Sequence, residues 1–208
     1  MATGLDNDLP AEATSAGWVP ASPVVLEVAT PEERVEWREA YLKRIAEEMG
    51  LPGVPYGELV RWTETHQEFD GANVECLTDA GFPARLSWGG GIVFDPGVPP
   101  EQDQALDLAL YTCLAKYMGR PEILSDFNNA QLGILWDYWT EAYVPCLEAN
   151  GVGIPEDPPT RESFIAEFYT DSRWWPEEWV PLEWGEKRLA ELYQRCPVYP
   201  QTEYLFGS

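Results

Sequence analysis

Residues 74–81 read VECLTDAG, and residues 144–151 read VPCLEANG. Both stretches fit one frame, V-x-C-L-x-x-x-G, with a cysteine at the third place. The chain has two further cysteines, and each falls late in a run whose apolar residues recur at helical spacing. The simplest interpretation is an internal duplication with one disulfide in each copy. The predicted disulfides are Cys76–Cys113 and Cys146–Cys196.

The sequence around these frames predicts a mainly α (α+β) fold. Two disulfide-linked helical repeats are expected over about residues 58–119 and 125–197. A small β-hairpin is expected in the first repeat, because three glycines separate two runs of β-formers over residues 84–94. Residues 1–29 are polar and then rich in Pro and Ala, which predicts a flexible leader. Residues 30–208 are expected to form a single globular domain.

Residues 30–33, TPEE, are a strong helix start. Thr30 suits the N-cap, Pro31 suits the first turn, and Glu33 completes a capping box. Gly50 ends this helix, and Pro145 is expected to kink a later one just before its cysteine. Further helices are predicted over residues 58–67, 70–80, 99–118, 132–150, 160–168 and 181–196.

The number and spacing of the cysteines favour disulfides over metal binding. Four cysteines allow three pairings, and the duplication is what selects among them. The chain has no C-x-x-C motif and a single histidine, His66, so a Cys/His zinc site and a thiol redox motif are both disfavoured. No metal, cofactor or catalytic residue is assigned.

Disulfides imply an oxidising compartment, so the predicted location is extracellular or in the cell envelope. The first residues are polar, and an export signal or lipid anchor is expected to have been removed from this sequence. The alternative is a cytosolic protein whose cysteines are free and buried.

The chain is strongly acidic, with 36 acidic and 13 basic residues and a formal net charge of −23. Nucleic acids and anionic membrane surfaces are disfavoured as partners, because both attract basic proteins. No apolar run approaches the roughly 20 residues of a membrane span, so membrane insertion is not expected. The charge also favours a soluble monomer. A glycan, a cationic ligand or an envelope protein remain candidate partners.

Tryptophan is the main functional signal. The chain has ten, and six follow residue 130. Aromatic faces beside carboxylates can stack a sugar ring or cage a cation, whereas the competing interpretation is a core built around a disulfide. The candidate ligand-binding residues are Trp136, Trp139, Trp174, Trp175, Trp179, Trp184, Tyr143, Glu141, Glu177 and Glu178.

Three functions follow from these features. The first is a noncatalytic exported binding or interaction domain with an acidic, Trp-rich surface. The second is an envelope or glycan hydrolase, for which Glu141 with Glu177 or Glu178 are the best carboxylates. The third is a purely structural envelope protein.

Three motifs carry a resemblance to a known family. They are residues 75–82 (ECLTDAGF), residues 136–148 (WDYWTEAYVPCLE) and residues 158–164 (PPTRESF). With the Cys196-Pro197 ending, they resemble a family of exported, often lipid-anchored actinobacterial proteins without an assigned activity. The resemblance spans roughly residues 30–205. It implies export and the duplicated cysteine frame, and it carries over no active site.

Overall fold

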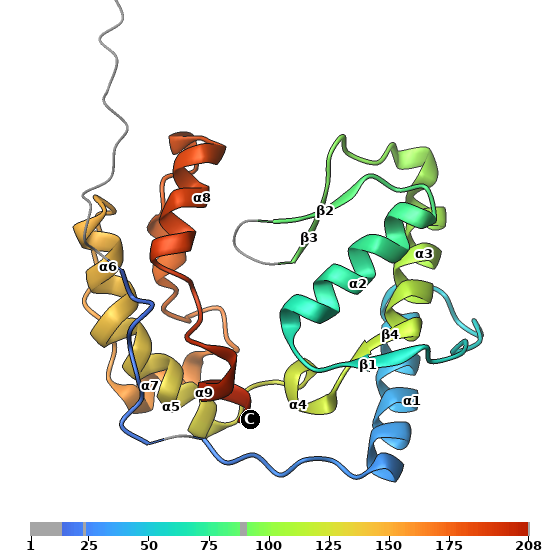
Figure 1. The fold of residues 1–208 in the computed structure, drawn as a ribbon, viewed down its shortest axis with the longest axis horizontal. Helices are drawn as coiled ribbons and strands as arrows, with labels where there is room; N and C mark the ends of the chain where they lie inside the picture. Colours follow the sequence, from blue (N-terminus) through green and yellow to red (C-terminus); the bar gives the residue numbers. More distant parts are fainter. Residues whose placement is uncertain (1–13, 23, 88–90, 208) are drawn as a thin grey trace, which may run out of the picture. The chain divides into compact units, whose positions relative to one another are not determined.

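The computed structural model describes residues 14–22, 24–87 and 91–207, and the chain divides into two compact units (Figure 1). Leu26–Asp126 form one, called here the inserted unit. The segment ending at Val25 and Phe127–Ser208 form the other, called the outer unit. The single globular domain expected over 30–208 stays a prediction.

The predicted fold class is confirmed. The described residues are mainly helical with two small sheets. Each unit holds one of the predicted disulfides: Cys76 pairs with Cys113, and Cys146 pairs with Cys196.

The two cysteine frames fold into the same helix end. In the first, Phe82 N–H donates to the Leu77 carbonyl at 3.0 Å, and in the second, Val152 N–H donates to the Leu147 carbonyl at 3.0 Å. These six-residue closures are the hallmark of a Schellman cap, which needs a residue with positive φ. The glycine that ends each frame supplies it, with φ of 95° at position 81 and 90° at position 151. Both frame leucines are fully buried, so the frame fixes a cap, a disulfide and a core contact together.

Helices α1, α2 and α3 dominate the inserted unit (Figure 1). The predicted capping box of α1 is present, because the Thr30 side chain accepts from the Glu33 amide and the Glu33 carboxylate accepts from the Thr30 amide. The elements are α1 (Pro31–Glu48), β1 (Arg61–Thr63), α2 (His66–Asp79), β2 (Ala84–Leu86), β3 (Ile92–Phe94), a 3-10 turn (Pro100–Gln102), α3 (Asp103–Lys116), β4 (Tyr117–Gly119) and α4 (Pro121–Leu124).

The helix expected over residues 58–67 is wrong. Its centre is strand β1, which pairs in parallel with β4, with Trp62 opposite Met118. The next helix starts at His66, earlier than expected, because the Thr65 side chain caps it by accepting from the Glu68 amide at 3.1 Å. A strand of three residues leaves almost no periodic signal, and its partner lies far along the chain.

The predicted hairpin is formed by β2 and β3, which pair antiparallel with Ala84 opposite Phe94. The Ser87 amide donates to the Gly91 carbonyl at 3.0 Å as the strands approach the turn. The first two of the three predicted turn glycines, at positions 89 and 90, lie outside the described residues.

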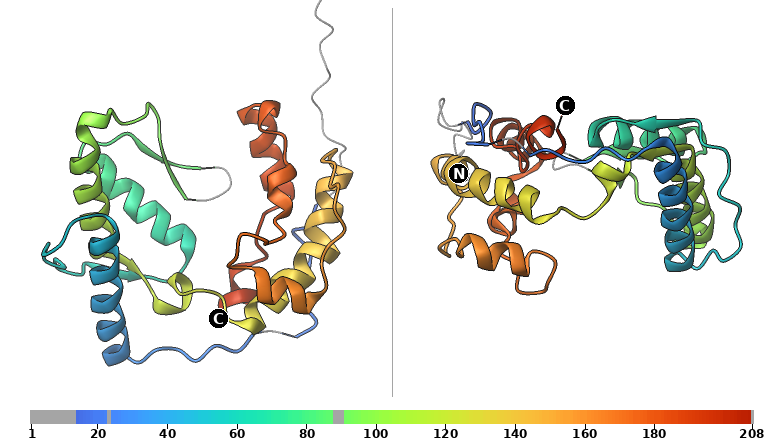
Figure 2. Two further views of the ribbon diagram at one scale, coloured as in Figure 1. Left: turned by 180° about the vertical axis from the view of Figure 1, so that it is seen from behind. Right: turned by 90° about the horizontal axis from the view of Figure 1, so that it is seen from below.

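The outer unit is built on one helical rod, visible from behind in Figure 2. The rod changes to a π-helical turn ahead of Pro145 and then returns to α-helix. Proline has no amide hydrogen and crowds the preceding turn, which accounts for the wider π turn at this point; the predicted kink stays a prediction. The elements are α5 (Asn129–Tyr138), the π turn (Trp139–Tyr143), α6 (Val144–Ala149), α7 (Arg161–Glu167), 3-10 turns (Pro176–Trp179 and Leu182–Trp184), α8 (Glu186–Arg195) and α9 (Thr202–Phe206).

Gly133 in α5 lies at a close approach of a long side chain. A Cβ at this position would meet the Arg161 Cζ at 2.7 Å. The Arg161 side chain therefore crosses the rod over the glycine and reaches Asp137, where its Nε lies 3.4 Å from Oδ1. This crossing ties the start of α7, capped by Thr160, to the rod.

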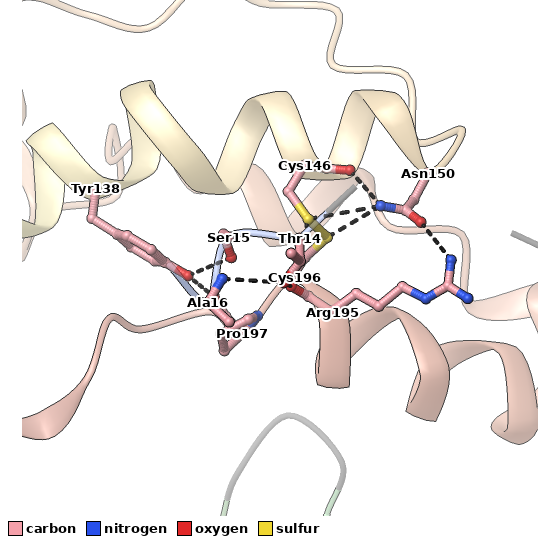
Figure 3. Close-up of a disulfide and its surroundings, with 9 residues drawn as sticks. All are labelled: Thr14, Ser15, Ala16, Tyr138, Cys146, Asn150, Arg195, Cys196 and Pro197. Carbon is pink, nitrogen blue, oxygen red and sulfur yellow. Dashed lines mark hydrogen bonds between the residues drawn. A yellow bond between two sulfur atoms is a disulfide. The ribbon is translucent and has the colours of Figure 1, made fainter. Parts of the chain in front are cut away.

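The described end of the predicted leader is packed on the outer unit (Figure 3). The Arg195 carbonyl accepts from the Ser15 amide at 3.0 Å and from the Thr14 hydroxyl at 2.9 Å. Ser15 is buried, and its hydroxyl lies 2.8 Å from the Tyr138 hydroxyl, which donates to the Pro197 carbonyl at 2.5 Å. Residues 14–18 therefore form a strap beside the second disulfide.

Asn150 lies on the other side of this disulfide, as Figure 3 shows. Its side-chain amide donates to the Cys146 carbonyl at 2.8 Å and lies 3.4 Å from the Cys196 sulfur. Asn150 is 1% exposed, so its hydrogen bonds stabilise a polar group that would otherwise be costly to bury.

Candidate binding site

The tryptophans selected from the sequence mostly belong to the core of the outer unit. Trp139 is fully buried, and its indole N–H donates to the Val198 carbonyl at 2.8 Å. Tyr143 is also fully buried, and Trp174 is 8% exposed. These three side chains are therefore closed to a ligand.

The neighbouring Trp174 and Trp175 both pack on Trp139. Their ring centroids lie 6.1 Å and 5.0 Å from that of Trp139, in edge-to-face geometry. Trp179 packs on Trp174 at 6.4 Å. Trp175 and Trp179 are half-buried. The loop over residues 174–179 thus places two adjacent indoles against the same ring, that of Trp139. Neighbouring residues in a regular helix or strand would point in different directions.

Glu177 is tied to this aromatic cluster. Its carboxylate accepts from the Trp175 indole at 3.3 Å and from the Tyr193 hydroxyl at 3.1 Å. Burial and the charge of Glu177 raise the pKa of Tyr193 and of Tyr143, and they raise the pKa of Tyr199 to about 12. Glu177 acts here as an internal hydrogen-bond acceptor.

These tyrosines make the stability of the outer unit sensitive to alkali. A phenol whose pKa is raised by folding stabilises the folded state fully below pH 10, and this contribution is lost as the pH rises through the folded-state value. The pKa of Tyr138 is raised to about 12. Burial raises it, and the hydrogen bond with Ser15 lowers it by a smaller amount. Between pH 10 and 12, the unfolding free energy of the natural chain is expected to fall with pH. In Tyr138→Phe this fall should be smaller by about 1.4 kcal/mol per pH unit, because one titrating phenol has been removed.

Urea unfolding at several pH values measures this slope. The same variant at pH 7 is the control, because there it reports only the two lost hydrogen bonds. An unchanged slope in Tyr138→Phe would contradict the assignment of the raised pKa.

The remaining predicted residues make other hydrogen bonds or lie at the surface of this core. The Trp136 indole donates to the Pro159 carbonyl at 3.1 Å, and Glu141 accepts from the Trp18 indole at 2.9 Å. Glu178 is exposed. The structure therefore gathers all six predicted tryptophans and Tyr143 in or against one core cluster. Glu177 is hydrogen-bonded to that cluster, whereas Glu141 accepts from Trp18 and Glu178 is exposed.

Trp184 borders a small surface hollow of about 210 Å³. The Arg188 guanidinium carbon lies 3.5 Å from the Trp184 ring centroid, which is a close cation–π contact. One face of this indole is thus already covered by the chain itself. A second hollow, of about 300 Å³, lies beside the strap and is lined by Trp18, Tyr138 and Tyr199 among others.

A larger hollow, missed by the sequence analysis, lies in the inserted unit and is called here the α1 hollow. Its volume is about 440 Å³. The signal that could have revealed it is an aromatic pair four residues apart on α1, followed by an arginine. The lining residues are Trp37, Ala40, Tyr41, Arg44, Leu124, Ser125 and Asp126.

Trp37 and Tyr41 form the floor of the α1 hollow. Their rings are stacked, with centroids 4.7 Å apart and an interplanar angle of 27°. Both side chains are half-buried, while Leu42 and Ala46 turn the neighbouring face of α1 into the core. The periodicity of the helix therefore holds the aromatic pair at the edge of the core, where part of each ring meets solvent.

The part of the lining that Leu124 supplies depends on a glycine in β4. A Cβ at Gly119 would meet Leu124 Cγ at 2.6 Å, so only glycine lets Leu124 lie this close to β4. The Ser125 amide donates to the Pro121 carbonyl at 2.9 Å and closes the short helix α4. Ser125 and Asp126 follow directly and are exposed at the rim.

The lining of the hollow itself contains one cation, Arg44, and one carboxylate, Asp126. The Arg44 guanidinium carbon lies 5.0 Å from the Tyr41 centroid, and Arg44 also pairs with Glu48 at 3.0 Å. Asp126 supplies the negative group of the lining. Burial raises the pKa of Tyr41, and the nearby Arg44 partly offsets this. The α1 hollow thus offers an aromatic floor with one cation, one hydroxyl and one carboxylate above it.

Comparison of the chain with protein-family models, with curated proteins and with solved structures finds no match. The resemblance to exported actinobacterial proteins therefore stays a prediction. Among the described residues, no helix is both long and apolar enough to cross a bilayer. Within the same part of the chain, no three His, Cys, Asp or Glu side chains form a group suited to a metal ion.

Proposed function

We propose that this chain is an exported cell-envelope protein that binds a ligand without chemical turnover, and that the α1 hollow is its binding site. The observation that carries the proposal is the stacked, half-buried pair of Trp37 and Tyr41 on the floor of a hollow of about 440 Å³. This volume lies within the range of about 300–1,000 Å³ that is common for small-molecule sites. A few polar groups above an aromatic floor suit orientation of a ligand.

A binding role is favoured over hydrolysis by the use of the candidate carboxylates. Glu141 and Glu177 both accept hydrogen bonds from indoles of the outer unit. A glycosidase needs two carboxyl groups facing a substrate across a cleft. Carboxylates that hold tryptophan side chains in place support a structural assignment for both residues.

Export is supported by the two disulfides. Disulfides persist in oxidising compartments and are rare in the cytosol. One closes a sequence separation of 37 residues and the other of 50. The acidic net charge of −23 favours a monomer that does not adhere to anionic envelope surfaces.

The binding function is tested by two-dimensional NMR of the intact chain. Cellobiose, maltose, glucuronate and choline are titrated separately, and the indole N–H signals of the tryptophans are followed. At least one compound is expected to shift the Trp37 signal, which Trp37→Phe identifies by its disappearance. The same samples are expected to contain the added compound unchanged after the experiment.

Two results would overturn the proposal. One is a Trp37 signal that no compound moves, and the other is conversion of a sugar to product. For export, fractionation of the source cells is expected to find the chain outside the cytoplasm with its four cysteines resistant to alkylation until a reductant is added. A cytosolic chain with free thiols would contradict this part.

A further inference from the structure

Resting on the proposed binding function, we infer that the ligand of the α1 hollow is an uncharged disaccharide. One pyranose ring stacks on Trp37, and the hydroxyl groups bond to Arg44, Ser125 and Asp126. Three properties of the α1 hollow favour this ligand class: the order of Trp37, Tyr41 and Arg44 along α1, the hydrogen-bonding groups at the rim, and the charges in the lining.

The order of the three side chains on α1 favours Trp37, rather than Tyr41, as the ring on which a ligand stacks. Trp37, Tyr41 and Arg44 follow one another along α1 at intervals of four and three residues, so they lie in line on one side of the helix. The Tyr41 ring is stacked on Trp37 and lies 5.0 Å from the Arg44 guanidinium carbon. Within this row of three side chains, Tyr41 contacts both Trp37 and Arg44, whereas the half-buried Trp37 contacts Tyr41 alone. A pyranose presents an apolar C–H face, which suits the electron-rich face of an indole.

The rim suits groups that both donate and accept hydrogen bonds. A guanidinium only donates, a carboxylate only accepts, and a serine hydroxyl does both. Sugar hydroxyls do both and can satisfy all three neighbours at once. Arg44 and Glu48 are 57% and 55% exposed in their side chains, so their ion pair contributes little and can yield one donor to a ligand at small cost.

The balance of charge disfavours ionic ligands. A quaternary ammonium on the aromatic floor would lie near the Arg44 guanidinium, which already covers the ring of Tyr41 and repels a second cation. A polyanion would be repelled by the net charge of −23. An uncharged ligand meets neither penalty, and the one Arg44 cation and one Asp126 carboxylate in the lining both serve it as hydrogen-bond partners.

The test compares how two charge-removing substitutions change affinity. Dissociation constants for cellobiose and maltose are measured by NMR titration for the natural chain, Arg44→Gln and Asp126→Asn. For an uncharged disaccharide, both substitutions are expected to weaken binding about fivefold, because each removes one charge-assisted hydrogen bond. Trp37→Ala is expected to weaken binding at least about tenfold.

The signs of these changes separate the ligand classes. If choline binds at Trp37 and Arg44→Gln strengthens it, the ligand is a cation and the inference is wrong while the proposed function stands. If glucuronate binds there and Asp126→Asn strengthens it, the ligand is an anion and the inference is equally wrong. If none of the four compounds shifts any indole signal, the proposed function fails as well.

Two further variants guard against loss of structure. Trp37→Phe keeps an aromatic platform and is expected to retain binding within about threefold, whereas a general loss of folding would abolish binding in both Trp37 variants. Trp184→Ala removes a half-buried indole in the outer unit and is expected to leave the affinity unchanged. A sugar whose binding is lost in Trp184→Ala and kept in Trp37→Ala would place the ligand elsewhere and overturn the inference.

Discussion

Trp139→Ala is expected to lower the unfolding free energy of the outer unit by about 4 kcal/mol, within the usual range for deleting a buried aromatic side chain. The Trp139 side chain is fully buried and contacts Phe164, Trp174 and Trp175 edge-on. Its loss leaves a cavity that the rigid helical rod cannot close. It also leaves the Val198 carbonyl without the indole donor, which adds a desolvation cost. Typical stabilities are about 5–15 kcal/mol, so little folded outer unit should survive mild warming.

Urea unfolding followed by hydrogen exchange measures this effect unit by unit. Leu182→Ala is the matched control, because Leu182 is 79% exposed and its truncation should change stability by less than about 0.5 kcal/mol. Trp139→Phe should fall between the two variants, since it keeps most of the packing. Equal stability of Trp139→Ala and Leu182→Ala would show that Trp139 is not the centre of this core.

The double substitution Cys146→Ala with Cys196→Ala is expected to cost the outer unit about 4 kcal/mol. The disulfide closes a sequence separation of 50 residues, and loop-closure arithmetic for a loop of this length gives about that value. The same arithmetic gives nearly the same cost for Cys76→Ala with Cys113→Ala, whose separation is 37 residues. The two double variants differ in which unit they affect.

Hydrogen exchange on the two double variants separates these effects. Loss of Cys146–Cys196 should weaken protection in α5 and α8, and loss of Cys76–Cys113 should weaken protection in α2 and α3. Unchanged urea midpoints in both variants would contradict the stabilising role of the disulfides. The natural chain unfolded with and without a thiol reductant provides the comparison without any substitution.

Local signals in the sequence predicted much of the fold. The capping box at Thr30, the N-cap at Thr160 and both cysteine frames are short-range features, and each appears as predicted. The duplication correctly selected one of three disulfide pairings. These features succeed because the residues that stabilise them lie within a few positions of one another, or recur in a second copy.

Features that depend on distant partners were missed. Strand β1 is held by β4, and nothing between Glu58 and Gln67 announces that partner. For the Trp loop the sequence leaves two interpretations open, a ligand-binding surface and a core around the disulfide, because two adjacent indoles can both be buried only in an irregular loop. In the structure the loop packs both against Trp139. The α1 hollow depends on Leu124 approaching over Gly119, a contact that no periodic pattern encodes.

The path of the chain has a consequence for biosynthesis. The strap residues precede the inserted unit in the chain, and their partner Arg195 follows it. Domains tend to fold as units while the chain emerges from its N-terminus. The inserted unit can therefore fold and form the Cys76–Cys113 disulfide before Arg195, the hydrogen-bond partner of Ser15, has been synthesised. The outer unit is completed only after Arg195 and Cys196 have been made, so a polypeptide interrupted before Cys196 would carry a finished inserted unit and an unfinished outer one.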